Sequence, residues 1–167
     1  MSVEQTGRSL HITGKWAGFD ALSGREVHDL LKLRQDVFVV EQACAFGEID
    51  GKDPTALHYF LLSPSGEIAG ALRLFAGSGA DRPSRIGRVV IAPEYRGQKL
   101  GQRLMRDGID KALERIRAYA PDALVVALGL DGYEGDPFGG LGISTDGFAK
   151  IAAQIGTLGL PTVLVQE

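Results

Sequence analysis

The chain has 167 residues with a net charge of −3, 44% hydrophobic and 23% charged residues, and one cysteine. These values suit a single folded domain with one core and exclude a disordered chain. The acidic balance argues against a nonspecific nucleic-acid binder, and the lone Cys44 excludes an intrachain disulfide framework. Because the chain has no apolar run of about 18 residues and no signal-like N-terminus, we expect a cytoplasmic protein that binds neither membrane nor nucleic acid.

The first part of the chain predicts short strands and two helices. In chain order we expect a strand over 10–16, a helix over 27–38, strands over 57–63, 67–75 and 85–91, and a long helix over 101–120. The second and third of these strands are joined by Ser63-Pro-Ser-Gly, a turn that closes hairpins. Residues 41–54 carry turn signals without periodicity and predict a long loop.

The last part of the chain predicts a strand–helix–strand unit. Residues 123–130 form a nearly continuous apolar run, which is typical of a strand buried on both faces. A glycine-rich loop over 135–142 follows, then a helix over 148–155 with Ser144-Thr-Asp as capping residues, and a strand over 161–166. The order of elements predicts an α/β (α+β) fold with one mixed, mostly antiparallel sheet flanked by helices.

The stretch 89–105 carries the most information about function. A buried strand runs into a turn with glycines at 97 and 101, and a helix begins at once. Free N–H groups at such a helix start, together with the positive end of the helix dipole, favour binding of a pyrophosphate. Arg96, Lys99 and Arg103 add positive charge around the turn. The alternative, from the residues alone, is an ordinary tight strand-to-helix connection.

This stretch resembles motif A of the GNAT acetyltransferases, which reads Arg/Gln-x-x-Gly-x-Gly/Ala after the fourth strand. Arg96 and Gly101 match, and Lys99 stands where many members have the middle glycine. The resemblance implies a GNAT-like fold and an acetyl-CoA cosubstrate that lies in a gap beside the fourth strand. The implied cofactor-binding residues are Val89, Val90 and Ile91 for the pantetheine and, around the pyrophosphate, Arg96, Gly97, Gln98, Lys99, Leu100, Gly101 and Gln102.

A second segment narrows the resemblance. The run Leu33-Arg-Gln-Asp-Val-Phe-Val-Val-Glu-Gln, followed by Glu48-Ile-Asp-Gly-Lys-Asp, is similar to the ElaA-like branch of GNAT proteins. It is also loosely similar to the acyl-homoserine-lactone synthases, which would require S-adenosylmethionine and an acyl-carrier partner. Together the two matches cover about 31–106. They imply transfer of an acetyl group from acetyl-CoA to a small primary amine.

Acyl transfer to an amine needs the amine in its neutral form, and a positioned base helps to remove its proton. The candidate bases are Glu41, Glu48, Asp50 and His58. We select Glu41, since it follows an apolar Val-Val step, where a half-buried carboxylate would have a raised pKa. The alternative is that Glu41 caps or salt-bridges the end of a loop.

Other polar residues here have structural as well as functional interpretations. The acidic residues of the 41–54 loop either bind a cationic amine or are solvated; these are Glu48, Asp50 and Asp53. Arg34 is either a charge in a ligand pocket or the partner of a loop carboxylate such as Glu41. His58 is expected to be a packed core residue, and Cys44 has no adjacent histidine that would make it a nucleophile.

From about residue 110 the chain resembles a different family. The run Ala112-Leu-Glu-Arg-Ile-Arg-Ala-Tyr-Ala-Pro-Asp-Ala-Leu-Val-Val-Ala-Leu-Gly-Leu-Asp, and the residues after it, resemble the histone deacetylase and acetylpolyamine amidohydrolase family. Asp131 matches a zinc ligand of that family, but its companion Asp-x-His pair is missing. We therefore expect no metal site, and we expect Asp131 simply to end a strand.

These resemblances indicate a chimera within one domain, 1–167. A GNAT portion, 1–110, would be joined to a deacetylase-like strand–helix–strand portion, 111–167, which stops before that family's catalytic tyrosine. A divergent natural GNAT protein is the alternative origin. The 123–130 strand is expected to occupy the fifth-strand position, beside the fourth strand.

The join has consequences for activity and assembly. The GNAT tyrosine that protonates the leaving thiolate is missing, and Tyr133 is not expected to replace it. The alternative function is therefore a folded chimera with a GNAT scaffold and little or no activity. Loss of the GNAT C-terminal hairpin exposes a sheet edge, which predicts a homodimer.

Overall fold

The structure is a computed structural model that describes residues 11–75, 77, 84–137 and 140–166. Its strands form a four-stranded antiparallel sheet in the order β1-β2-β3-β4 and a separate parallel pair, β5-β6. The strands are β1 (Thr13–Gly18), β2 (Leu57–Leu62), β3 (Ile68–Phe75), β4 (Arg85–Ile91), β5 (Leu124–Leu128) and β6 (Thr162–Gln166). The helices are α1 (Gly24–Gln35), α2 (Leu100–Tyr119) and α3 (Thr145–Gly156), with short turns η1 (Phe19–Ala21), η2 (Asp36–Glu41), η3 (Asp53–Thr55) and η4 (Pro93–Tyr95).

Helix α1 begins with a capping box and ends in a wider turn. The Ser23 side chain accepts a hydrogen bond from the Glu26 N–H at 3.2 Å, and the Glu26 carboxylate accepts one from the Ser23 N–H at 2.8 Å. After Gln35 the chain continues as a π-helical turn, η2, down to Glu41. The helix predicted over 27–38 is therefore present, and the turn that follows it sets the position of Glu41.

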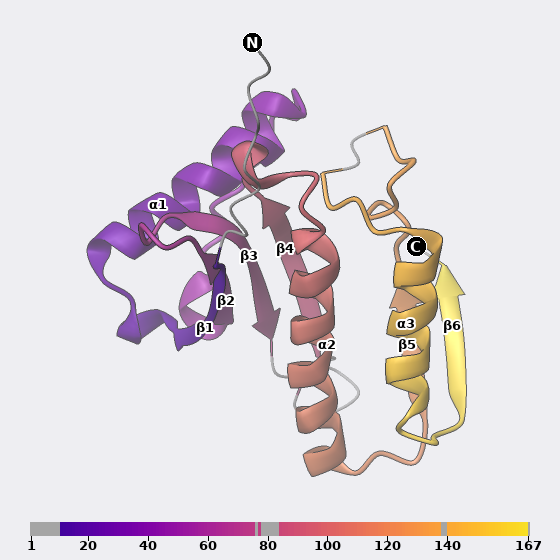
Figure 1. The fold of residues 1–167 in the computed structure, drawn as a ribbon. Helices are drawn as coiled ribbons and strands as arrows, with labels where there is room; N and C mark the ends of the chain where they lie inside the picture. The colour runs from indigo at the N-terminus through magenta and orange to yellow at the C-terminus, as the bar shows by residue number, and fades with distance from the viewer. Residues whose placement is uncertain (1–10, 76, 78–83, 138–139, 167) are drawn as a thin grey trace.

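The four-stranded sheet is covered on both faces, as Figure 1 shows. Alternation along β2 sends Phe60 to the α1 side, with Leu30 and Val37, and sends Tyr59 and Leu61 to the α2 side. The predicted hairpin between β2 and β3 is confirmed, because Ser63 N–H donates to the Glu67 carbonyl at 2.9 Å. The result is a helix–sheet–helix sandwich, the mostly antiparallel sheet flanked by helices that the sequence predicts.

Helix α2 has a second apolar face that carries α3. Ile109 and Leu113 of α2 pack against Ile143 and Ile151 in a third core cluster, and α3 lies on the side of α2 away from the sheet (Figure 1). The predicted cap of α3 is confirmed, since the Ser144 side chain accepts from Gly147 N–H at 3.2 Å. The C-terminal unit is thus attached to the sandwich mainly through α2.

The prediction for the 123–130 strand is wrong in two respects. Within the described residues β5 pairs only with β6, so it does not occupy a fifth position beside β4. The strand is also not buried on both faces, because Val125 is 69% exposed. An apolar run indicates that the side chains of a strand pack against other elements, but it does not identify those elements. The single mixed sheet that the sequence predicts is therefore two sheets.

Candidate functional site

The turn between β4 and α2, residues 92–99, is the centre of the candidate site. Strand β4 ends at Ile91, η4 follows, and α2 begins at Leu100. Gly97 and Lys99 both have left-handed backbone conformations, with φ of 76° and 59°. A glycine adopts this conformation without strain. Lys99, which is not a glycine, adopts it at the N-cap position of α2. We call residues 96–102 the phosphate turn.

The backbone N–H groups of residues 97–102 are open. In the described part of the chain, no acceptor is recorded for any of them, and the first N–H in use is that of Arg103, which donates to the Lys99 carbonyl at 3.3 Å. The first N–H groups of a helix have no partner within it, and the helix dipole places partial positive charge there. The phosphate turn is thus shaped to bind an anion through its backbone.

Arg96 and Glu41 form an ion pair at the edge of the phosphate turn. The two guanidinium Nη atoms donate to the two carboxylate oxygens at 2.7 and 2.8 Å. The Arg96 hydrogen bonds lower the pKa of Glu41, although partial burial opposes this. The expected raised pKa is therefore wrong, and the alternative of a salt bridge at the end of a loop describes the Glu41 contacts. The catalytic role of Glu41 stays a prediction.

Strand β4 leaves one of its edges open beside the turn. It pairs with β3 on one side, and no described strand pairs with the other. The β3–β4 register shifts between Ala71 and Arg73, where Arg88 has φ of 52°. A bulge of this kind re-aims backbone groups at the strand edge. Backbone groups of Val89, Val90 and Ile91 follow this bulge, at the end of the strand that leads into the phosphate turn.

Gly101 is required by a close backbone contact. A Cβ atom at this position would lie 2.0 Å from the carbonyl oxygen of Leu141. The backbone that approaches Gly101 therefore belongs to the segment just before Ile143. The C-terminal portion therefore touches the phosphate turn directly.

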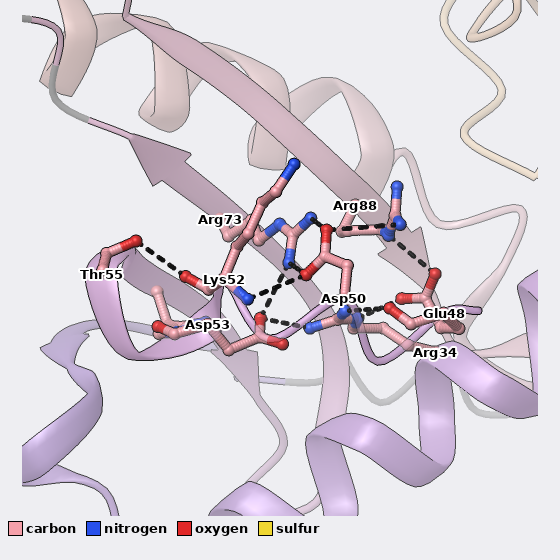
Figure 2. A network of polar contacts seen from close by, with 9 residues as sticks. Arg34, Glu48, Asp50, Lys52, Asp53, Thr55, Arg73 and Arg88 are labelled. Atoms are coloured by element: carbon pink, nitrogen blue, oxygen red, sulfur yellow. Dashed lines mark hydrogen bonds and ion pairs between the residues drawn. The ribbon is translucent and has the colours of Figure 1, made fainter.

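Behind the β4 bulge lies a buried network of three arginines and three carboxylates, shown in Figure 2. Arg34 of α1 is 1% exposed and contacts Glu48 through Nε at 2.5 Å and Asp53 through Nη1 at 2.6 Å. Its partner is thus a loop carboxylate, but not the Glu41 that the sequence suggested. The prediction of solvated carboxylates is wrong for Glu48 and Asp53, which are both buried because the loop folds back over the sheet.

The network continues onto the strands. Arg73 of β3 binds Asp50 at 2.5 and 2.9 Å and Asp53 at 3.1 Å, and Arg88 of β4 approaches Glu48 to 2.7 Å. The hydrogen bonds from Arg73 lower the pKa of Asp50 well below its usual range. These carboxylates are paired with arginines, so they are not free to bind a cationic amine. Their effect is to fix the 41–54 loop and the side chain of the bulge residue.

The remaining candidate residues take structural positions. His58 is buried as expected, its Nε2 lies 3.0 Å from the Asp53 carbonyl oxygen, and burial lowers its pKa. Cys44 is exposed, and Asp131 lies in an exposed turn after β5. Tyr133 pairs with Ile143 in an isolated bridge. Among the described residues, no group of three or more histidine, cysteine or carboxylate side chains is arranged so that it could hold a metal ion, and no helix is long and apolar enough to cross a bilayer.

The comparisons with known proteins agree with this geometry. The profile of the Acetyltransferase (GNAT) family matches residues 27–128. A crystal structure of an acyl-CoA N-acyltransferase from Pseudomonas aeruginosa is 33% identical, with a TM-score of 0.55 over 65% of this chain and 70% of that one. Escherichia coli ElaA is 35% identical, with a TM-score of 0.54 over 66% and 73% of the two chains. Because the family match covers more than half of the chain, the chain belongs to the GNAT acetyltransferase family.

Two further comparisons show how much of the chain is similar to curated proteins. The chain spans 56% of the length of the UPF0039 proteins of Mycobacterium, to which it is 44% identical over 87 residues. An acetylpolyamine amidohydrolase from Burkholderia pseudomallei is 51% identical over 59 residues, which are 35% of this chain and 17% of that protein. The second resemblance in the sequence is therefore a short, partial match.

Proposed function

We propose that the protein transfers an acetyl group from acetyl-CoA to a small primary amine. The observation that carries the proposal is the row of open N–H groups over 97–102 at the start of α2, beside the open edge of β4. The N–H groups bind the pyrophosphate, Arg96 adds positive charge, and the backbone of Val89, Val90 and Ile91 pairs with the pantetheine. Membership of the GNAT family supports this assignment.

The proposed reaction is a direct attack of a neutral amine on the thioester carbonyl. The nitrogen–carbon bond forms, the carbon–sulfur bond breaks, a base takes the amine proton, and the CoA thiolate takes up a proton to leave as the thiol. Glu41 is the proposed base. Its ion pair with Arg96 keeps the carboxylate in the proton-accepting form and also fixes the position of the Arg96 guanidinium.

A continuous assay of CoA thiol release, run with a panel of primary amines, tests the activity. Release should depend on both acetyl-CoA and the amine. Glu41→Gln should lower kcat by about 100-fold if the carboxylate accepts the proton. If Glu41 instead only positions Arg96, the variant should raise KM for acetyl-CoA and leave kcat within about twofold. Glu114→Gln, at an exposed carboxylate that pairs with Lys111 in the second half of α2, serves as the control.

A folded chimera that keeps the GNAT scaffold but has little or no activity is the second candidate function. Two observations favour it: β5 does not pair with β4, and 59 residues are 51% identical to an acetylpolyamine amidohydrolase. In that case acetyl-CoA binds without amine-dependent thiol release. The thiol assay and a binding titration together distinguish the two functions.

We also propose a homodimer that forms through β6. This strand pairs only with β5 within the described residues, and its apolar side chains are exposed: Val163 is 59%, Leu164 67% and Val165 46% exposed. An exposed apolar edge strand is a template for pairing with another chain. Light scattering after size-exclusion chromatography should give a dimer at tens of micromolar. Leu164→Lys should give a monomer, whereas Tyr119→Lys, at an exposed residue of α2, should not. A monomeric wild type contradicts the proposal.

A further inference from the structure

A cavity of about 280 Å³ lies between α2 and α3, next to the phosphate turn. At roughly 30 Å³ per water molecule, this volume has room for a phosphoryl group with several waters. Its polar lining comes from both helices: Lys99, Gln102, Arg103 and Arg106 from the start of α2, and Lys150 and Gln154 from α3. The cavity is therefore a joint product of the portion that matches the GNAT family and the portion beyond residue 128.

The charged side chains that line the cavity are all positive. Four of the lining residues are cations and none is a carboxylate. In the described part of the chain, no ion pair or hydrogen bond is recorded for the side chains of Lys99 and Lys150. Arg103 and Arg106 share Asp107, at 3.6 and 3.0 Å, and Arg103 also donates to the Ile12 carbonyl at 2.8 Å, so Lys99 and Lys150 are the cations of the lining most available to a ligand. Cations from two sides of one cavity favour an anion between them.

Contacts between α2 and α3 hold the two walls of the cavity together. Gln154 donates through Nε2 to the Arg106 carbonyl at 3.0 Å and to the Asp110 carboxylate, which ties α3 to α2 at this level. Gly147 lies close to Gln102, since a Cβ atom at Gly147 would be 3.6 Å from the Gln102 side chain. These contacts fix the distance between the two walls.

The position of the cavity relates it to the phosphate turn. Lys99 and Gln102 belong to both, and the cavity continues along α2 to Arg106, about 10 Å from Lys99 at 1.5 Å per residue. A ligand that places a pyrophosphate on the turn and carries another phosphate one ribose away can reach both places. In CoA the 3′-phosphate stands in that relation to the pyrophosphate.

We propose that this cavity binds the 3′-phosphate of CoA, with Lys150 of α3 as a cationic contact. The proposal rests on the proposed function, because it takes the pyrophosphate on the turn as its starting point. It assigns α3 a part in cofactor binding, although α3 lies outside the residues that match the GNAT family. A free phosphate ion is the other source of the same chemistry, and the experiment separates the two.

Calorimetric titrations with CoA and with 3′-dephospho-CoA test the proposal. The wild type should bind CoA about 10-fold more tightly, the effect of a charge-assisted contact of about 1.4 kcal/mol. Lys150→Ala should weaken CoA binding by about 3- to 10-fold and leave 3′-dephospho-CoA unchanged. Alanine is favourable in an exposed helix position, so α3 should remain folded. Arg25→Ala, which removes an exposed cation of α1, is the control and should change neither affinity.

The outcomes are distinguishable. Equal affinities of the wild type for both ligands overturn the cavity proposal and leave the proposed function intact. Absence of binding for both ligands overturns the proposed function and the cavity proposal with it. If inorganic phosphate binds in a Lys150-dependent way while the two CoA forms bind equally, the cavity takes free phosphate and the assignment to CoA is wrong.

Discussion

Replacing Gly97 with aspartate is expected to weaken acetyl-CoA binding by roughly 100-fold, because a carboxylate on the phosphate turn repels the pyrophosphate by roughly 2–3 kcal/mol. Gly97 suits this test better than Gly101. A Cβ atom at Gly97 meets nothing within 4 Å, whereas one at Gly101 would collide with the Leu141 backbone. A substitution at Gly101 would therefore displace the 141 segment as well as perturb the turn.

Gly97→Asn is the matched control for this prediction. Asparagine has nearly the same shape as aspartate, and it tolerates the φ of 76° better than most other residues. It should keep the affinity within about fivefold, since only the charge has been removed. Calorimetric titration of both variants with acetyl-CoA measures the difference. Equal loss in the two variants would mean that the backbone conformation, and not the charge, had been tested.

The second large effect is expected from the buried ion network in Figure 2. Arg34→Ala should lower the free energy of unfolding by about 3–5 kcal/mol, because it leaves Glu48 and Asp53 buried without one of their cations. For a chain of this size the melting temperature should fall by roughly 10 °C. Urea or thermal unfolding followed by circular dichroism measures the change.

Lys32→Ala is the matched control on the same helix. Lys32 pairs with Asp36 one turn away, but both side chains are exposed, so the pair should contribute less than about 0.5 kcal/mol. A loss below about 1 kcal/mol for Arg34→Ala would contradict the role assigned to the network. It would mean that water or Arg73 and Arg88 compensate for the missing guanidinium.

The parts of the structure that sequence predicts well are specified by local signals. Ser63-Pro-Ser-Gly closes the β2–β3 hairpin, Ser144 caps α3, and the glycines at 97 and 101 mark the turn before α2. In each case the residues that determine the conformation are neighbours in the chain. The resemblance to the GNAT family rests on the same short stretch, and the match over 27–128 confirms the family.

The parts that sequence does not predict depend on partners far apart in the chain. Glu41 and Arg96 are separated by 55 positions, and nothing in either neighbourhood indicates the other. Arg34 reaches carboxylates 14 and 19 positions away, which turns an apparently solvated loop into a buried one. For β5, the apolar run gives no information on whether β4 or β6 is its partner. Tertiary packing determines these pairings, and local sequence patterns do not predict it.

A titration of ¹⁵N-labelled protein with CoA, followed by amide NMR spectra, reports directly on the backbone N–H groups that are proposed to bind the pyrophosphate. The largest chemical-shift changes should fall on residues 97–102, with a second group at 89–91 beside the open edge of β4. Spectra that do not change at millimolar CoA, or that change only at residues far from the phosphate turn, would contradict this prediction.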